Sequence, residues 1–252
     1  MDVFKYRLNK LIFFVNFLFE RTPRVSFFEK LVLIIKFYYI SDAVDCPHSN
    51  IEMLLFARTV FHISEKSGGV IVEAGSYKGG STAKLSLIAK ISGRKLVVFD
   101  SFQGLPANRE VQTYTADIRA FHHYKKTTYV FPRGKYKGSL VEVKRNVGRY
   151  GVLELCSFKK GWFKETMPKF HEKITAAFLD VDLASSTRTC LKYLYPLLQP
   201  GGFLMSHDGH LTLVTEVFQN KDFWEKTVGF PKPPMFGLNK GKIISIIKPL
   251  YY

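Results

Sequence analysis

Residues 70–82 read VIVEAGSYKGGST, a short apolar run that meets an acidic residue and then a glycine-rich turn. The run predicts a buried strand that ends at Glu73, and the residues from about Ser81 to Ile91 predict a helix. Further apolar runs follow at 95–99, 153–158, 175–179, 203–206 and 242–248, with a helical pattern at 186–198. Short strands alternating with helices predict an α/β fold with a mostly parallel sheet and helices on both faces.

The first 65 residues have no strand-like alternation and predict helices, so the chain divides into a helical cap (1–65) and a main domain (66–252). Apolar runs at 11–19 and 31–35 are separated by charged residues, and neither approaches the roughly 20 residues that span a bilayer. A small-residue cleavage site does not follow them either. Two interpretations stay open: a cap that packs on the main domain or on the second subunit of a homodimer, and an interfacial anchor on an anionic membrane.

Composition excludes several classes of protein. With 46% hydrophobic and 23% charged residues, the chain is neither disordered nor collagen-like. Lys and Arg number 37 against 21 acidic residues, and this net charge of +16 favours an anionic partner. Cys46, Cys156 and Cys190 form no CxxC pair, which indicates a reducing, cytoplasmic compartment.

Acidic residues follow four of the predicted strands: Glu73, Asp100, Asp180 and Asp208. Ligands of such sheets bind at the carboxyl ends of the strands, and an idle buried carboxylate would be costly. Asp100, at the end of the second strand, stands where an acid commonly binds the two hydroxyls of a ribose. The glycine-rich turn after Glu73 matches neither a Walker A loop nor the dinucleotide pattern GxGxxG.

Four segments occur in an order that resembles the macrocin O-methyltransferase family: VEAGSYKGGST (72–82), VVFDSFQGLP (97–106), KGWFKETMP (160–168) and FLDVDLASSTRTCLKYLYPLLQPGGFLMSHD (178–208). The resemblance covers roughly residues 68–250. It implies a Rossmann-like class I methyltransferase fold and S-adenosyl-L-methionine as cofactor. The expected reaction is O-methylation of a hydroxyl on a sugar or glycoconjugate, a small-molecule or glycan acceptor.

The same resemblance assigns residues to the cofactor. It places Glu73, Gly75, Ser76 and Ser81 around the methionine end, in one loop with Gly79 and Gly80. Asp100 would bind the ribose with Ser101 and Phe102 beside it, and Trp162 would cover the adenine.

Metal-dependent members of the family hold magnesium with an Asp after the fourth strand and an Asp pair after the fifth. Asp180 and Asp208 match this pattern, but His207 replaces the first Asp of the pair. Because imidazole suits manganese, iron or zinc better than magnesium, the resemblance implies a divalent metal, Mg or Mn, with the preference moved toward Mn. Asp182 is a spare carboxylate nearby.

Methyl transfer requires alignment and removal of the hydroxyl proton. The expected catalytic residues are Asp180, His207 and His123, with His122 and His210 as further candidate bases. His48, His62 and His171 have no supporting context in the sequence.

Two alternative functions are an oxidoreductase and a methyltransferase that acts on nucleic acid. An NAD-dependent oxidoreductase would need the missing GxGxxG pattern. A nucleic-acid methyltransferase would use the basic runs at 122–126 and 133–137, but the base-binding motif Asn-Pro-Pro-Tyr is absent from the sequence.

Overall fold

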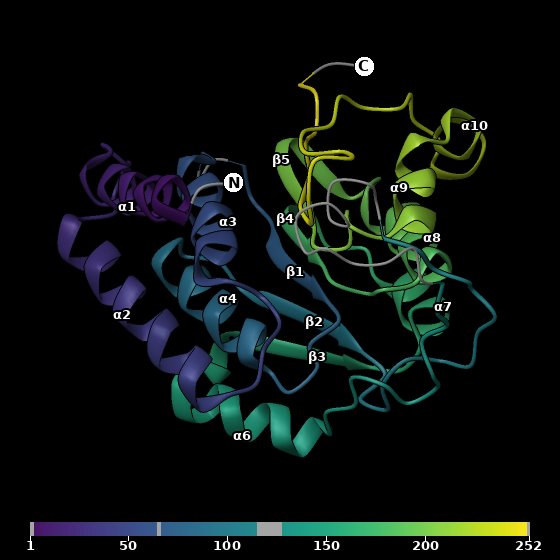
Figure 1. Cartoon of the computed structure of the whole chain (residues 1–252), viewed down its shortest axis with the longest axis horizontal. Coiled ribbons are helices and arrows are strands. Elements are labelled where there is room, and N and C mark those ends of the chain that lie inside the picture. The colour runs from purple at the N-terminus through teal and green to yellow at the C-terminus, as the bar shows by residue number, and fades with distance from the viewer. Residues whose placement is uncertain (1–2, 65–66, 115–127, 251–252) are drawn as a thin grey trace.

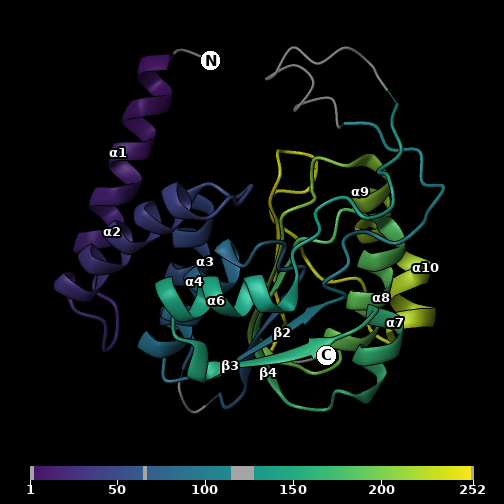
Figure 2. The ribbon, with the colours of Figure 1, turned by 90° about the horizontal axis from the view of Figure 1, so that it is seen from below.

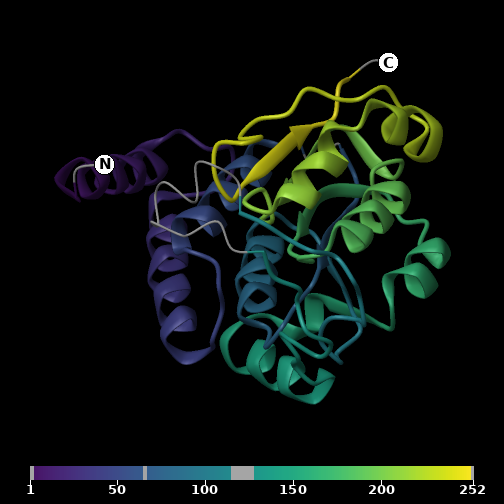
Figure 3. The ribbon, with the colours of Figure 1, turned by 45° about the vertical axis from the view of Figure 1, so that its right-hand side comes forward.

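The computed structural model describes residues 3–64, 67–114 and 128–250 (Figure 1). Its centre is a six-stranded sheet of order β3-β2-β1-β4-β5-β6. The strands are β1 (Val70–Ala74), β2 (Leu96–Asp100), β3 (Cys156–Lys160), β4 (Ile174–Leu179), β5 (Leu198–Ser206) and β6 (Ile244–Ile247). The first five run parallel, and β6 pairs antiparallel with β5 at the edge of the sheet (Figure 3). The predicted α/β fold with a mostly parallel sheet is confirmed.

Helices cover both faces of the sheet (Figure 1). One face carries α1 (Val3–Phe19), α2 (Phe27–Ala43), α3 (Asn50–His62), α4 (Gly80–Ile91) and α6 (Leu140–Tyr150). The other carries α7 (Phe163–Thr166), α8 (Ala184–Leu194), α9 (Thr212–Gln219), α10 (Lys221–Phe223) and the π-helical turn η3 (Trp224–Val228). Residues of β1 alternate between the two cores, with Ile71 on the first face and Val70 and Val72 on the second, as a pleated strand requires.

The N-terminal helices share the core of the sheet. The ring of Phe56 on α3 packs against Phe178 of β4 and Phe203 of β5, and Phe37 of α2 is fully buried in the same cluster. Helix α3 begins at a capping box in which Ser49 and Glu52 satisfy each other's backbone groups. The predicted N-terminal helices therefore exist, while a domain boundary at residue 65 stays a prediction.

Three predicted boundaries move. The third strand begins at Cys156, because the 3-10 turn η1 (Leu153–Leu155) occupies the residues before it. Helix α8 ends at Leu194 and does not reach Leu198, because Pro196 has no backbone N–H with which to continue the helical hydrogen bonds. Strand β5 begins at Leu198, and its register against β4 shifts where Pro200-Gly201-Gly202 passes through it.

Helix α1 runs along one side of the molecule, where it packs against both α2 and α3 (Figure 2). None of the helices in the described part of the chain combines the length and apolarity needed to cross a bilayer.

Candidate active site

A cavity of about 700 Å³ opens at the carboxyl ends of the strands. This volume lies within the range of small-molecule and cofactor sites. The walls come from the loops after β1 and β2, the ends of β4 and β5, and the connection between α2 and α3 (residues 44–49). The predicted site residues that line it are Gly75, Ser76, Ser81, Asp100, Ser101, Trp162, Asp180, His207 and Asp208.

The loop after β1 follows a course that only glycine permits at Gly75. Its φ is +87°, and a Cβ there would lie 2.0 Å from the carbonyl oxygen of Asp180. At Gly80, the first residue of α4, a Cβ would lie 2.6 Å from the Cβ of Cys46. The loop is thus held between the end of β4 and the α2–α3 connection.

Glu73 supports this loop from inside the protein and is not part of the cavity wall. The side chain is fully buried, and its two carboxylate oxygens accept hydrogen bonds from the hydroxyls of Ser81 (2.5 Å) and Thr82 (2.6 Å). Burial raises the pKa of Glu73 to about 7 despite these two donors. Gly79, Gly80 and Phe102 also lie outside the cavity lining, so direct contact with a cofactor stays a prediction for these four residues.

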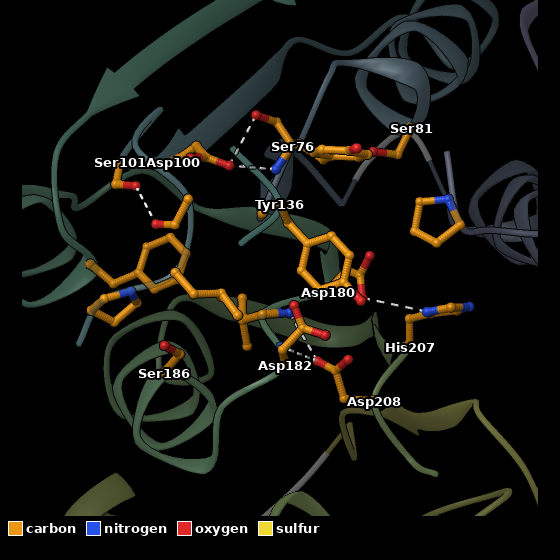
Figure 4. Close-up of a pocket in the computed structure, with 18 of the residues that line it drawn as sticks. Ser76, Ser81, Asp100, Ser101, Tyr136, Asp180, Asp182, Ser186, His207 and Asp208 are labelled. Atoms are coloured by element: carbon orange, nitrogen blue, oxygen red, sulfur yellow. Dashed lines mark hydrogen bonds and ion pairs between the residues drawn. The ribbon is translucent and has the colours of Figure 1, made fainter. Parts of the chain in front are cut away.

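Asp100 joins the loops after β1 and β2 (Figure 4). Its Oδ2 accepts hydrogen bonds from the backbone N–H (2.7 Å) and hydroxyl (3.0 Å) of Ser76, and its Oδ1 accepts one from the N–H of Phe102 (2.6 Å). Burial raises the pKa of Asp100 above its ordinary value, and these donors oppose the change. The carboxylate lines the cavity in a fixed orientation.

A second polar group surrounds Asp180 at the end of β4. His48 Nε2 lies 2.7 Å from Asp180 Oδ2, and His207 Nδ1 lies 3.4 Å from Asp180 Oδ1. Burial alone would raise the pKa of Asp180, but the two imidazoles hold it well below its usual range. Burial likewise opposes protonation of His207, yet Asp180 and Glu52 raise the pKa of this imidazole to about 10.

Glu52 extends this group on the far side of His207. Its carboxylate lies 3.3 Å from His207 Nε2 and also accepts the backbone N–H of Ser49 (2.7 Å). Although burial opposes it, His207 lowers the pKa of Glu52 to about 2. The same carboxylate that caps α3 therefore also holds an imidazole in the cavity wall.

Asp208 has a different role from its neighbour His207. Its Oδ2 accepts the backbone N–H groups of Val181 (2.9 Å) and Asp182 (3.1 Å), which fixes the loop after β4. Its Oδ1 is buried and has no hydrogen-bond partner among the described residues. Burial and the charge of Asp180 raise the pKa of Asp208 to about 7.

His210 is a further candidate base beside this group, with its ring centroid 6.4 Å from that of His207. His210 lines the cavity and stacks on Tyr114 with ring centroids 5.8 Å apart, and burial lowers its pKa to about 4. His122 and His123 lie outside the described residues.

The comparisons with known proteins agree with this geometry. The profile of the macrocin-O-methyltransferase family, TylF, matches residues 56–229. The chain belongs to this family. The matched range begins inside α3 and ends just after η3, so it includes every strand end that lines the cavity.

Two curated relatives of this macrocin-O-methyltransferase family member are O-methyltransferases by name, and the first name includes a rhamnosyl group. One is 8-demethyl-8-(2,3-dimethoxy-alpha-L-rhamnosyl)-tetracenomycin-C 4'-O-methyltransferase of Streptomyces olivaceus, 32% identical over 56% of this chain and 52% of the relative. The other is mycinamicin III 3''-O-methyltransferase of Micromonospora griseorubida, 33% identical over 56% and 55%. The chain spans about half the length of the curated relatives it matches.

Solved structures show the same fold. The O-methyltransferase NovP superposes with a TM-score of 0.68 over 88% of this chain and 99% of its own, at 22% identity. The calicheamicin methyltransferase CalS11 gives a TM-score of 0.52 over 90% and 94%, at 16% identity.

Within this family member, the structure brings Asp180 and His207 together as predicted and adds two residues that the sequence analysis did not select. His48 and Glu52 precede β1 and follow no strand, so the strand-end argument passes over them. The one available signal was the capping box at 49–52, which fixes where α3 begins but does not show what the start of α3 faces.

Proposed function

We propose that this chain transfers a methyl group from S-adenosyl-L-methionine to a hydroxyl of a sugar or glycoconjugate. One observation carries the proposal: the fixed carboxylate of Asp100 and the glycine loop after β1 lie at adjacent parallel strand ends, on the wall of one large cavity. Family membership and the O-methyltransferase names of the relatives, one of which includes a rhamnosyl group, support the reaction.

In the proposed complex, Asp100 accepts hydrogen bonds from the ribose hydroxyls and Ser101 lies beside it. The backbone from Gly75 to Ser81 borders the methionine end, and Trp162 covers the adenine. Trp162 follows Gly161, whose N–H bonds to the carbonyl of Asp100, so the indole and the carboxylate belong to one edge of the cavity. In this proposed complex the methyl donor lies between Asp100 and Asp180, which both line the cavity (Figure 4).

The chemical step needs alignment and a proton acceptor. Transfer to a sulfonium carbon is an in-line displacement, so a rigid site contributes mainly by orienting the two reactants. We assign orientation of the acceptor to Asp180 and His207, which fix each other in the cavity wall. The unpartnered oxygen of Asp208 is the acceptor available to the hydroxyl proton, because its other oxygen is already occupied by the loop after β4. The proposed role of His123 stays a prediction.

The ligand atoms present show whether this site suits the metal expected from the family. Asp180 and His207 come together with a second imidazole, His48, and not with Asp208, in the set of donors found among the described residues. Two nitrogen donors and one carboxylate do not fit magnesium, which prefers oxygen ligands. Assistance by a divalent metal therefore stays a prediction, with manganese favoured over magnesium.

Calorimetry with S-adenosylhomocysteine tests the cofactor proposal. Asp100→Ala should weaken binding by about 1–3 kcal/mol, since hydrogen bonds to a charged acceptor are lost. Asp222→Ala is the control, because Asp222 is also an acidic residue but is exposed and paired with Lys226 on α10 and η3. Wild-type affinity in Asp100→Ala, or no binding by the wild-type protein, would reject the proposed site.

The acceptor class is tested by mass spectrometry with the labelled cofactor. We expect label in a glycosylated small molecule, such as one that carries a rhamnosyl group, and none in RNA or DNA. Label in nucleic acid alone would favour the alternative of a nucleic-acid methyltransferase, which the basic composition suggests.

We also propose that α1 and α2 rest on an anionic membrane surface. On α2, the side chains of Phe28, Val32, Ile35 and Tyr39 recur at helical spacing and are 73%, 49%, 60% and 61% exposed. On α1, Leu11, Val15 and Phe19 form a similar exposed row. The sequence of the same segment is rich in basic residues: Lys5, Arg7, Lys10, Arg21, Arg24 and Lys36. An apolar face with basic flanks is typical of interfacial helices. A homodimer through this face is the alternative outcome.

A cytoplasmic location of the protein stays a prediction.

A further inference from the structure

We infer that Tyr77 and Tyr136 form an aromatic pair that binds the positively charged sulfonium group of S-adenosyl-L-methionine and favours it over the uncharged thioether of the product. Both residues line the cavity, and their rings meet edge to face with centroids 5.7 Å apart at 80°. The inference rests on the proposed function, because it names how the same site selects its methyl donor.

Both tyrosines hold a backbone conformation that is unusual for a residue other than glycine. The φ angles are +47° at Tyr77 and +57° at Tyr136, in the left-handed region. Bulky residues rarely adopt this region, and those that do gather at ligand sites, where the surrounding structure holds them. Asp182, with a φ of +58°, lines the same cavity. The strained backbone is therefore concentrated at the cavity wall that carries the two rings.

Contacts from neighbouring segments fix the pair in place. Leu105, in the loop after β2, donates its N–H to the carbonyl of Lys135 (2.8 Å), the residue before Tyr136. The hydroxyl of Tyr77 donates to Asp45 Oδ2 (3.0 Å) in the α2–α3 connection. The two rings are thus held from the loops after β1 and β2 and from the N-terminal segment, so they can present a preformed surface to a ligand.

The ring of Tyr136 lies between the side chains of Asp100 and Asp180 in the view of the cavity (Figure 4). It is 37% exposed, so part of its surface is open to a ligand. Burial and the carboxylates of Asp182 and Asp180 raise the pKa of Tyr136 to about 12, which keeps the phenol neutral. A cation beside this ring is therefore attracted both by the ring and by the nearby carboxylates.

Charge distinguishes the methyl donor from the product at this position. Methyl transfer breaks the S–CH₃ bond and leaves its electron pair on sulfur, so a cationic sulfonium becomes a neutral thioether. Aromatic faces attract cations, and the ammonium group of Lys135 already lies 4.9 Å from the centroid of the Tyr136 ring. The reaction thus removes the charge that the aromatic pair binds, and the product should leave more easily than the donor.

Calorimetry with two ligands that differ in charge tests the pair without any assay of activity. Sinefungin carries a protonated amine in place of the sulfonium methyl group, whereas S-adenosylhomocysteine is uncharged at sulfur. Tyr136→Leu should weaken sinefungin binding by about three- to thirtyfold and leave S-adenosylhomocysteine binding nearly unchanged. Tyr77→Leu should lower the same ratio of affinities, so that either variant alone decides the result.

Two further variants serve as controls. Tyr136→Phe keeps the ring and should retain the wild-type ratio of affinities. Tyr39→Leu is the matched control, since Tyr39 also meets a tyrosine edge to face, Tyr150 at 5.6 Å, but lies outside the cavity. Circular dichroism of each variant checks that the fold is retained.

The outcomes separate this inference from the proposed function. Asp100→Ala should weaken both ligands equally, because both contain the same ribose. Absence of binding of both ligands to the wild-type protein would reject the proposed cofactor site itself. Wild-type binding of both ligands, with an unchanged ratio of affinities in correctly folded Tyr136→Leu or Tyr77→Leu, would overturn the inference and leave the cofactor site in place.

Discussion

At the scale of single residues, Glu73 is a buried acid whose carboxylate is hydrogen-bonded by two hydroxyl groups in place of water. Because burial raises its pKa from 4.5 to about 7, the folded protein binds this proton more tightly than the unfolded chain does. Glu73 thus costs no stability below about pH 4.5, and its ionisation destabilises the fold as the pH rises toward 7.

Replacing Glu73 with Gln should remove that part of the pH dependence. Between pH 4.5 and 7 the free energy of unfolding of the wild-type protein should fall by about 3 kcal/mol more than that of Glu73→Gln. Denaturant unfolding at several pH values measures the difference. Parallel pH profiles for the two proteins would show that Glu73 ionises normally in the fold.

Gly75 and Gly93 offer a second comparison at this scale. Both have positive φ, but a Cβ at Gly93 meets nothing within 4 Å, whereas one at Gly75 meets the backbone of Asp180. Gly93→Ala should cost about 1–2 kcal/mol of stability through its backbone conformation alone. Gly75→Ala should cost more and should also weaken binding of S-adenosylhomocysteine, measured by calorimetry. Equal effects in both variants would mean that the loop moves freely away from β4.

The residues that could be predicted are those whose role follows from their position after a strand. Asp100 and Asp180 were identified because parallel strands end at one edge of a sheet. His48 and Glu52 were not, because their contacts with Asp180 and His207 join segments more than a hundred positions apart. A periodic pattern reports which face of an element is buried, but not what a connecting segment touches.

At the scale of elements, the exposed apolar face of α1 and α2 makes a prediction about membrane binding. Ile35→Glu should reduce co-sedimentation with anionic liposomes by about tenfold or more, because it removes apolar burial and adds repulsion. Val141→Glu is the matched control, since Val141 is 79% exposed on α6 and lies outside this face.

Salt and lipid charge complete that test. Raised ionic strength should weaken binding of the wild-type protein, because screening reduces attraction between basic residues and anionic lipid. Equal binding to neutral liposomes, or none to either kind, would contradict the membrane proposal. A concentration-dependent dimer that Ile35→Glu disrupts would instead assign the face to a second copy of the chain.

The elements themselves were largely predictable, and their ends less so. Apolar runs identified β1, β2 and β4 because central strands are buried on both faces. The start of β5 was missed because Pro200-Gly201-Gly202 predicts a turn, while here the strand continues through an irregular register.

At the scale of the whole molecule, cofactor binding should stabilise the entire fold. The cavity takes its walls from both helical layers and from four strand ends, so a ligand there bridges parts that separate on unfolding. S-adenosylhomocysteine at 100 times its dissociation constant should add about 2.7 kcal/mol, which raises the melting temperature by several degrees. Calorimetric scans measure the change, with NAD as the comparison. A larger increase with NAD would favour the oxidoreductase alternative.

The pairing of β1 with β4 also has a consequence for synthesis of the chain. Val70 lies beside Ile174, so the central strand leaves the ribosome long before its second neighbour exists. Phe56 of α3 is likewise synthesised well before Phe178 and Phe203, the two rings against which it packs. Three apolar helices are therefore made before the sheet that covers them, and non-local pairing of this kind is slow. The nascent chain is thus expected to need protection from aggregation until β5 has been translated.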